Sequence, residues 1–287
     1  MEVRIKKMSQ IQQINVENVL LEKSPKLHRF LPKFFINWLK KTLHEKEINQ
    51  ILRELENDFE IDFINKGLKK LNVKSQAIGI ENIPKKSGVI LVANHPLGGL
   101  DGIAMIQQIS NVRNDVNFLV NDILTQINKL KPYFIPINKH GKNSRKNLLK
   151  IDELYRSESC IVLFPAGLVS RRQENKKIKD LEWKKSFITK AKKHNKTIIP
   201  VHVNGINSMK FYNLSYWRKK FGIKLNIEML FLVDEMFKKN GSTITFSFGK
   251  PISPEIFHNK ISDLEWAQKI KNHVYELENN PNFDFRI

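Results

Sequence analysis

The feature that most constrains the fold is a regular alternation, from residue 73 onward, of short apolar runs with helical patterns. The runs have the length and composition of buried strands, and the segments between them carry apolar residues at helical spacing. Strands that alternate with helices predict an α/β fold, with a mixed, largely parallel sheet flanked by helices. We expect strands over residues 73–80, 89–93, 116–120, 134–137, 160–164, 197–203, 225–233 and 243–248, and helices over 143–156 and 181–194.

The first 72 residues differ because they are helical in pattern and contain no strand-like run. Apolar residues between 30 and 43 recur at helical spacing with lysines beside them, which is typical of a helix that lies in a membrane interface. Packing of the same helix on the rest of the protein is the alternative, and the pattern leaves both open. We expect an N-terminal helical region over 1–72, an α/β domain over 73–287, and membrane contacts by Phe34, Phe35 and Trp38.

Net charge is the bulk property that bears most on partners. The chain has 49 Lys and Arg against 29 Asp and Glu, which gives +20 at pH 7. Such a charge attracts polyanions, either nucleic acid or an anionic membrane surface, although an abundance of Lys, Asn and Ile also fits a compositionally biased genome. The aromatic residues are not interleaved with basic ones, and no nucleic-acid motif is present. We therefore expect an anionic membrane surface and no nucleic acid.

Cysteine usage and hydropathy bear on the compartment. The single cysteine, Cys160, excludes an internal disulfide framework and favours a reducing environment. The N-terminus shows no signal-peptide pattern, and no apolar run approaches the roughly 18–20 residues that span a bilayer. No Cys/His spacing indicates a metal site. We expect a protein without a metal, cytoplasmic and peripheral on the inner face of the cytoplasmic membrane.

The segment 94–101, Asn-His-Pro-Leu-Gly-Gly-Leu-Asp, carries the strongest indication of chemistry. It follows the apolar run 89–93, so His95 is expected at the carboxyl end of a strand, where active sites of α/β sheets gather. A tight turn through the glycines would let Asp101 hydrogen-bond to His95, fixing the imidazole tautomer for removal of a proton from a hydroxyl. The alternative is that Asp101 caps a helix and His95 is an ordinary loop residue.

Two further strand ends carry polar or cationic residues. After the run 160–164, a Pro/Gly turn leads to Ser170, Arg171 and Arg172, and guanidinium groups suit phosphate or carboxylate. The run 134–137 leads to Lys139. The alternative in each case is a solvated loop with surface cations.

These segments, followed by residues 198–205, resemble the four motif blocks of the glycerolipid acyltransferase superfamily, which includes the lysophosphatidic acid acyltransferases. The resemblance covers roughly residues 73–250. The chain departs from the family pattern in having five residues between His95 and Asp101, one more than is usual. Ala166 stands where the family has a glutamate, and Lys139 stands near the position of a family arginine. These departures put the usual contacts with a glycerol phosphate headgroup in doubt.

Segments 94–102, 164–172 and 180–187 are similar to one branch, the bacterial lyso-ornithine and lyso-glycine lipid O-acyltransferases. This resemblance implies acyl transfer from acyl carrier protein or coenzyme A to a membrane lipid acceptor, a hydroxyl on an N-linked 3-hydroxy fatty acid, without a bound cofactor. His95 is then the general base and Asp101 orients it. The alternatives are a lysophosphatidic acid acyltransferase and, in other classes, a nucleic-acid-binding or non-catalytic membrane-binding protein. The expected substrate-binding residues are Asn94, Gly98, Gly99, Lys139, Phe164, Pro165, Gly167, Ser170, Arg171 and Arg172.

Overall fold

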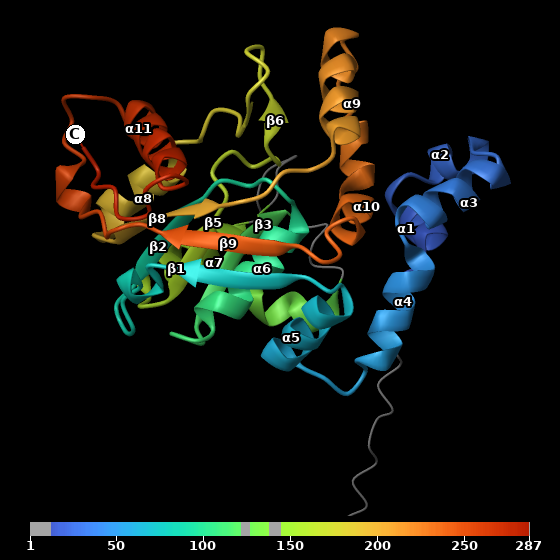
Figure 1. Cartoon of the computed structure of the whole chain (residues 1–287), viewed down its shortest axis with the longest axis horizontal. Helices are drawn as coiled ribbons and strands as arrows, with labels where there is room; N and C mark the ends of the chain where they lie inside the picture. Colours follow the sequence, from blue (N-terminus) through green and yellow to red (C-terminus); the bar gives the residue numbers. More distant parts are fainter. Residues whose placement is uncertain (1–12, 122–126, 138–144, 287) are drawn as a thin grey trace, which may run out of the picture.

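The structure is a computed structural model that describes residues 13–121, 127–137 and 145–286 (Figure 1). Within these ranges seven strands form one sheet in the order β1-β9-β8-β2-β5-β3-β4. All neighbouring strands run parallel except β8 and β9, which are antiparallel. This confirms the expected mixed, largely parallel sheet. The strands are β1 (Lys74–Ile78), β2 (Val89–Ala93), β3 (Val116–Asn121), β4 (Phe134–Ile137), β5 (Cys160–Leu163), β8 (Thr197–Val203) and β9 (Thr243–Phe248), and a separate antiparallel pair contains β6 (Arg171–Arg172) and β7 (Ile178–Lys179).

The central strand β2 is buried along its whole length, between β5 and β8. A strand covered on both faces needs an uninterrupted apolar sequence, and Val-Ile-Leu-Val-Ala supplies it. Cys160 of β5 pairs with Val89 and is fully buried, and this burial raises the pKa of its thiol to about 12. The cysteine is therefore part of the packed core, as an unreactive thiol.

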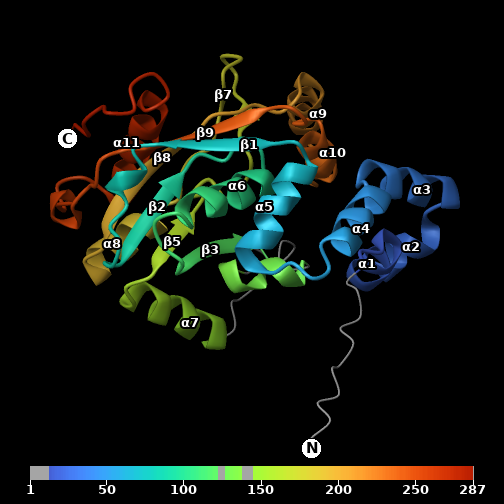
Figure 2. The same ribbon diagram turned by 60° about the horizontal axis from the view of Figure 1, so that its bottom comes forward.

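Helices cover both faces of the sheet (Figures 1 and 2). Because successive strand residues point to opposite faces, Val89, Leu91 and Ala93 pack with α5 and α6, while Ile90 and Val92 pack with α7, α8 and α11. The two layers share β2, whose carboxyl end leads directly into α6. The bounds are α5 (Glu60–Lys70), α6 (Gly99–Ile109), α7 (Arg145–Arg156), α8 (Ser186–His194) and α11 (Asp263–Glu276), with 3-10 turns η1 (Ile80–Asn82), η3 (Asn128–Tyr133) and η5 (Pro254–Ile256).

The N-terminal helices α1–α4 lie beside the sheet, at the right of Figure 1. His44 joins them to the helix α10 (Leu232–Phe237): its Nε2 atom is 3.1 Å from Oδ1 of Asp234, and its ring stacks on Phe237. No helix in the described ranges is long and apolar enough to cross a membrane. The bounds are α1 (Val16–Lys23), α2 (Pro25–Phe30), α3 (Lys33–Thr42) and α4 (Glu45–Glu54).

One expected strand is wrong. Residues 225–233 contain the 3-10 turn η4 (Ile227–Phe231) and the start of α10, and they follow the helix α9 (Met209–Lys220). Their apolar side chains pack against helices, because Phe231 and Leu232 join a small cluster built on Phe211 and Tyr212. The segment also contains a buried carboxylate, Glu228, which pairs with Arg171 of β6. The helices α9 and α10 with η4 therefore form a helical unit after β8.

Other boundaries move by a few residues. The strand expected over 73–80 ends at Ile78, because Gly79 adopts a left-handed conformation (φ 72°) and starts the turn η1. The helix expected over 181–194 begins at Ser186, after a non-helical stretch that buries Trp183. The remaining expected strands agree with the structure to within one residue.

Candidate active site

His95 and Asp101 lie at the carboxyl end of β2, in the turn into α6 and in the first turn of that helix. The Nδ1 atom of His95 is 2.9 Å from Oδ2 of Asp101. A carboxylate oxygen only accepts hydrogen bonds, so Nδ1 is assigned the hydrogen and Nε2 keeps the basic lone pair. No hydrogen bond from the described residues reaches Nε2, and the His95 side chain is 14% exposed. This nitrogen is therefore the atom available to accept a proton.

The turn between the two residues is held by its own backbone. The Leu97 amide donates to Oδ2 of Asp101 at 2.9 Å, and the Asp101 amide donates to the Gly98 carbonyl at 3.0 Å. Gly98 has φ 76°, and a Cβ atom there would lie 3.3 Å from the Leu232 side chain of α10. Both the conformation and the close approach favour glycine. The turn thus accommodates five intervening residues and still brings the carboxylate onto the imidazole.

Burial controls the electrostatics of the pair. Asp101 is fully buried, which raises its pKa, whereas the hydrogen bonds from His95 and the Leu97 amide act in the opposite direction. One face of the imidazole stacks on Phe164, with ring centroids 4.0 Å apart. The ring therefore has one carboxylate, one aromatic neighbour and one free nitrogen. An imidazolium that forms here gains a buried counter-charge at once.

Asp180 is the residue that sequence reasoning missed. Its Oδ1 atom accepts hydrogen bonds from the His95 amide at 3.2 Å and from the Ser170 hydroxyl at 2.5 Å. Its Oδ2 atom accepts from the Trp183 indole at 2.9 Å. Ser170 in turn donates its amide to the His95 carbonyl at 2.8 Å. Asp180 and Ser170 thus hold both backbone polar groups of His95, and burial raises the pKa of Asp180.

The expected cations after β5 lie nearby but have protein partners. Arg171 is buried, and its guanidinium donates to Oε1 of Glu228 at 2.9 Å and lies over the Phe211 ring. Arg172 is half-buried and donates to Oδ1 of Asn213 at 2.8 Å. Burial without full compensation lowers the pKa of Arg171. Arg172 is the more accessible of the two donor groups.

Some of the other expected residues lie in the turns that follow β2 and β5, and others lie elsewhere in the chain. Asn94 exchanges two hydrogen bonds with Val203 and so ties the end of β2 to β8. Phe164, Pro165 and Gly167 form the turn after β5, and Gly99 begins α6. Lys139 lies outside the described residues. The expected membrane residues Phe34, Phe35 and Trp38 are on α3.

Comparisons with known proteins give the family. The acyltransferase family model matches residues 18–283. The chain belongs to the acyltransferase family. It is 42% identical over 265 residues to a lyso-glycine lipid O-acyltransferase of Bacteroides thetaiotaomicron, covering 92% of this chain and 97% of the relative. It is 40% identical to a protein of the same name from Phocaeicola vulgatus, covering 92% and 95%.

Among solved structures, this acyltransferase is similar to the 1-acyl-sn-glycerophosphate (LPA) acyltransferase PlsC from Thermotoga maritima. The TM-score is 0.46 and the sequence identity is 17%, over 85% of this chain and 89% of the other.

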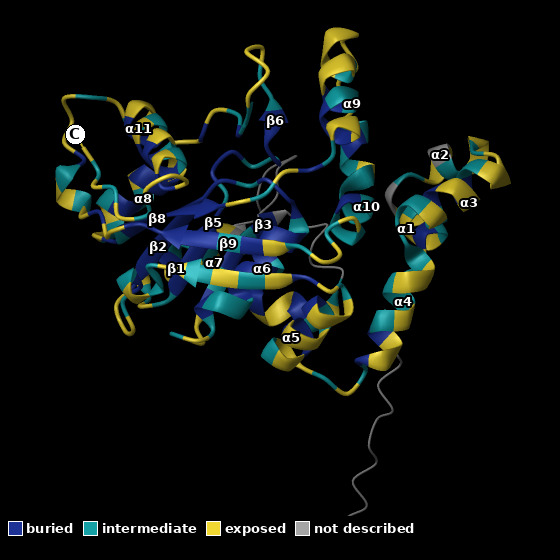
Figure 3. Ribbon diagram, in the orientation of Figure 1, coloured by how far each residue is buried: buried dark blue, intermediate teal, exposed yellow. Residues whose placement is uncertain are grey.

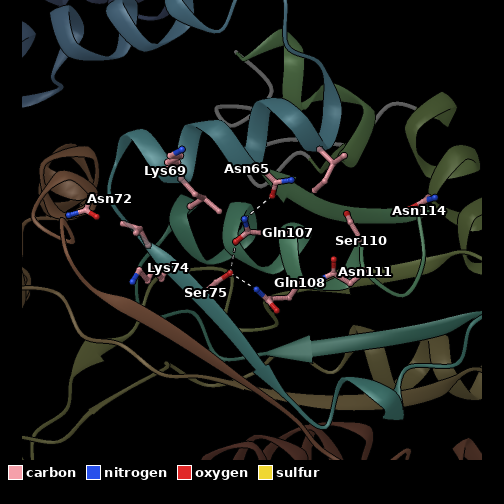
Figure 4. Close-up of a pocket in the computed structure, with 13 residues that line it drawn as sticks. Asn65, Lys69, Asn72, Lys74, Ser75, Gln107, Gln108, Ser110, Asn111 and Asn114 are labelled. Atoms are coloured by element: carbon pink, nitrogen blue, oxygen red, sulfur yellow. Dashed lines mark hydrogen bonds between the residues drawn. The ribbon is translucent and has the colours of Figure 1, made fainter.

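A groove elsewhere on the acyltransferase lies among α5, β1 and the carboxyl-terminal part of α6 (Figure 4). Its polar side chains bond to one another: Gln107 contacts both Asn65 and Ser75, and Gln108 donates to Ser75. Asp101 is at the opposite end of α6, so this groove is separate from the His95 site. Across the described ranges, no three His, Cys, Asp or Glu side chains are placed to hold a metal ion.

Proposed function

We propose that this acyltransferase moves a fatty acyl chain from a thioester to the hydroxyl of a lyso-glycine lipid. The two relatives of that name are 42% and 40% identical over 92% of the chain, which supports this acceptor. The replacement of the phosphate-side glutamate by Ala166 fits an acceptor without glycerol phosphate. The donor is a thioester of acyl carrier protein or of coenzyme A.

The observation that carries the mechanism is the free Nε2 atom of a histidine whose Nδ1 atom is 2.9 Å from a buried carboxylate. Nε2 of His95 takes the proton from the acceptor hydroxyl as its oxygen attacks the thioester carbonyl carbon. Asp101 stabilises the imidazolium that forms. The carbon–sulfur bond then breaks, and the imidazolium returns the proton to the leaving thiolate. The products are the acylated lipid and the free thiol of the donor.

The oxyanion of the tetrahedral intermediate needs donors close to His95. The first amides of a helix have no partners within the helix, and their dipoles favour negative charge. Gly98 and Gly99 are the N-cap and the first residue of α6, and they lie between His95 and Asp101 in the chain. We assign oxyanion stabilisation to this turn. The planar guanidinium of Arg172 suits the acceptor carboxylate or a donor phosphate.

The acceptor resides in a bilayer, so the enzyme must bind a membrane surface, here the inner face of the cytoplasmic membrane. The helix α3 supports such a contact because Phe34 is 74% exposed, while Ile36 and Leu39 on its other side are buried. Phe30, at the end of α2, is 82% exposed. Phe35 is half-buried and Trp38 contacts Phe231, so they contribute less exposed surface than Phe34.

The test offers three acceptors to one preparation of purified protein: lyso-glycine lipid, lyso-ornithine lipid and lysophosphatidic acid. Each is combined with an acyl thioester of acyl carrier protein and, separately, of coenzyme A. We expect the highest kcat/KM with lyso-glycine lipid, and a His95→Ala preparation corrects for co-purifying host enzymes. Faster acylation of lysophosphatidic acid would overturn the proposed acceptor and favour the alternative.

A further inference from the structure

The carboxyl-terminal half of α9 and the loop after it, residues 216–225, project from the body of the molecule at the top of Figure 1. We call this segment the α9 tip. Nearly all of it is exposed, and Figure 3 shows the end of α9 largely in the colour of exposed residues. Phe221 and Leu225 are 72% and 73% exposed, and Trp217 and Ile223 are also exposed. Contiguous exposed apolar side chains of this kind mark interaction sites.

The exposure is built into the fold of the tip. The Arg218 guanidinium donates to the Ile223 carbonyl at 2.7 Å, and the Ile223 amide donates to the Arg218 carbonyl at 3.0 Å. Gly222 permits the reversal, with φ 69°. Arg218 also bonds to Oε1 of the buried Glu228 at 3.2 Å, which attaches the tip to the core. Trp217 stacks on Phe221, so the aromatic rings form one surface.

The charge of the tip identifies the kind of partner. Residues 216–225 contain four cationic residues and no Asp or Glu, and a fifth cation, Lys210, lies near the start of the same helix. The Lys220 ammonium lies 4.9 Å from the centroid of the Trp217 ring, so cations and aromatics occupy the same surface. Aromatic rings with flanking lysines suit the headgroup level of a bilayer, where the rings enter the apolar boundary and the ammonium groups meet anionic lipid. The cations are Lys210, Arg218, Lys219, Lys220 and Lys224.

The helical unit that carries the tip contacts the N-terminal helices. The Phe231 ring of η4 contacts Trp38 of α3, with centroids 5.9 Å apart, and the ammonium of Lys210 on α9 lies over the same ring. Residues 24–44 likewise contain basic residues and no Asp or Glu. The adjoining α10 places Leu232 against the catalytic turn at Gly98. The elements between α3 and the α9 tip therefore pack against the turn that contains His95 and Asp101.

We propose that the α9 tip is a membrane-docking element, which inserts Trp217, Phe221 and Leu225 into the interface of an anionic bilayer. It extends the membrane contact of the proposed function, on which it rests only for the expectation that the acceptor is a lipid. Vesicle binding tests it without any acyl transfer, so failure of the proposed acceptor and failure of this surface are distinguishable.

The first experiment measures co-sedimentation with vesicles of equal parts phosphatidylglycerol and phosphatidylcholine. We expect the double variant Phe221→Ala/Leu225→Ala to bind about thirtyfold more weakly than the unchanged protein, from the apolar area that it removes. The matched control is Leu148→Ala/Leu149→Ala, which removes two exposed leucines from α7, far from α9 in Figure 2, and should bind normally. Unchanged binding of the Phe221/Leu225 variant overturns the proposal.

The second experiment uses the tryptophans as reporters. The chain has four, of which Trp183 and Trp266 are fully buried, so in a Trp38→Phe variant Trp217 is the exposed one. We expect vesicles with bromine on the acyl chains to quench its fluorescence, and the double variant Trp38→Phe/Trp217→Phe to lose that quenching. Absence of quenching overturns insertion. A self-association that Phe221→Ala abolishes while vesicle binding persists would assign the surface to a second copy of the chain and overturn the proposal.

Discussion

The carboxyl end of β2 and the α9 tip differ in whether their charged side chains are buried or exposed. Around β2, the carboxylates Asp101 and Asp180 are buried, and each accepts hydrogen bonds from the segment that contains His95. At the α9 tip, Lys219 and Lys220 are exposed beside exposed aromatic rings. Charges that are buried need fixed partners, so they set geometry, whereas exposed charges act on whatever approaches. Variants at the carboxyl end of β2 should therefore change turnover, and variants at the α9 tip should change the affinity for vesicles.

The largest expected effect is at His95, the proposed catalytic base. His95→Ala removes the atom that takes the acceptor proton, and we expect kcat to fall by about 10⁴-fold, near the upper end of general-base contributions. Vesicle affinity should stay the same, because the His95 side chain is only 14% exposed and is not part of the exposed apolar surface. Steady-state assay and co-sedimentation of one preparation check both parts. Retention of more than a tenth of the activity by a folded His95→Ala protein would remove the base assignment.

The next largest effect is expected at the buried ion pair between Arg171 and Glu228. Glu228→Gln removes the buried counter-charge that both Arg171 and Arg218 contact, and we expect a loss of about 3 kcal/mol in the free energy of unfolding. Urea denaturation measures it. The comparison variant is Glu17→Gln, which breaks the solvent-accessible pair with Lys40 and should cost much less, because solvent screens that pair. Equal losses in the two variants would show that burial of the Arg171 pair does not determine its contribution.

Asp180 should affect turnover through the position of His95. Asp180→Asn weakens the acceptor of the His95 amide and the Ser170 hydroxyl, and we expect kcat to fall about 10²-fold with little change in the donor KM, or about 2.7 kcal/mol. Trp183→Phe is the control, because it removes the indole hydrogen bond to the same carboxylate together with part of a buried ring, but keeps the acceptor of the His95 amide and the Ser170 hydroxyl. If Trp183→Phe lowered kcat as much, Asp180 would act on general packing and not on His95.

A smaller effect concerns pH. Burial lowers the pKa of His202, in β8, from its ordinary value near 6.5 to about 4. Below pH 6.5 the unfolded chain takes up a proton that the folded chain does not, so this residue's contribution to stability is complete above pH 6.5 and is lost as pH falls towards 4. From pH 7 to pH 5 the loss is about 2 kcal/mol.

Urea denaturation of the unchanged protein and of His202→Leu at pH 7 and pH 5 tests this. The decrease in unfolding free energy between the two pH values should be about 2 kcal/mol smaller in the variant. His273, whose pKa burial also lowers, is present in both proteins and cancels in the difference. An identical decrease in both would contradict a neutral, buried His202.

The smallest effect is at the N-terminal helices. Phe30→Ala/Phe34→Ala removes two exposed rings, and we expect vesicle affinity to fall about tenfold, less than for the α9 tip because the rings lie on two different helices. Turnover of an acceptor dispersed in detergent should be unaffected. A drop in turnover with dispersed acceptor would mean that these rings support the catalytic region and not only attachment.

Most of the sheet could be predicted because local composition decides buried strands. The run Val89–Ala93 has no polar residue, and a strand covered on both faces is the structure that uses it best. Residues 225–233 show the limit of that reasoning. Their composition suits a strand equally well, but the pairing of Glu228 with Arg171, 57 residues earlier, and the packing of Leu232 on the helical cluster determine a helical structure. Such contacts have no local pattern.

In the site, too, the local contacts could be predicted and the long-range contacts could not. The pairing of His95 with Asp101 could be anticipated because one short turn contains both. Asp180 is 85 residues from His95, and the sequence indicated only that its segment resembles a family motif. The partner of Arg171 is 57 residues away, so an arginine expected to face substrate is held by Glu228 inside the protein. Long-range pairing is what the pattern of residues alone does not contain.

The burial of Cys160 has a practical consequence. The chain has one cysteine, and its thiol is inside the sheet with a raised pKa, so thiol reagents have no reactive native target. A cysteine introduced at an exposed position therefore becomes the unique labelling site without any prior substitution. Spin labels or dyes attached in this way could report distances and depth at chosen points while the enzyme keeps its native core.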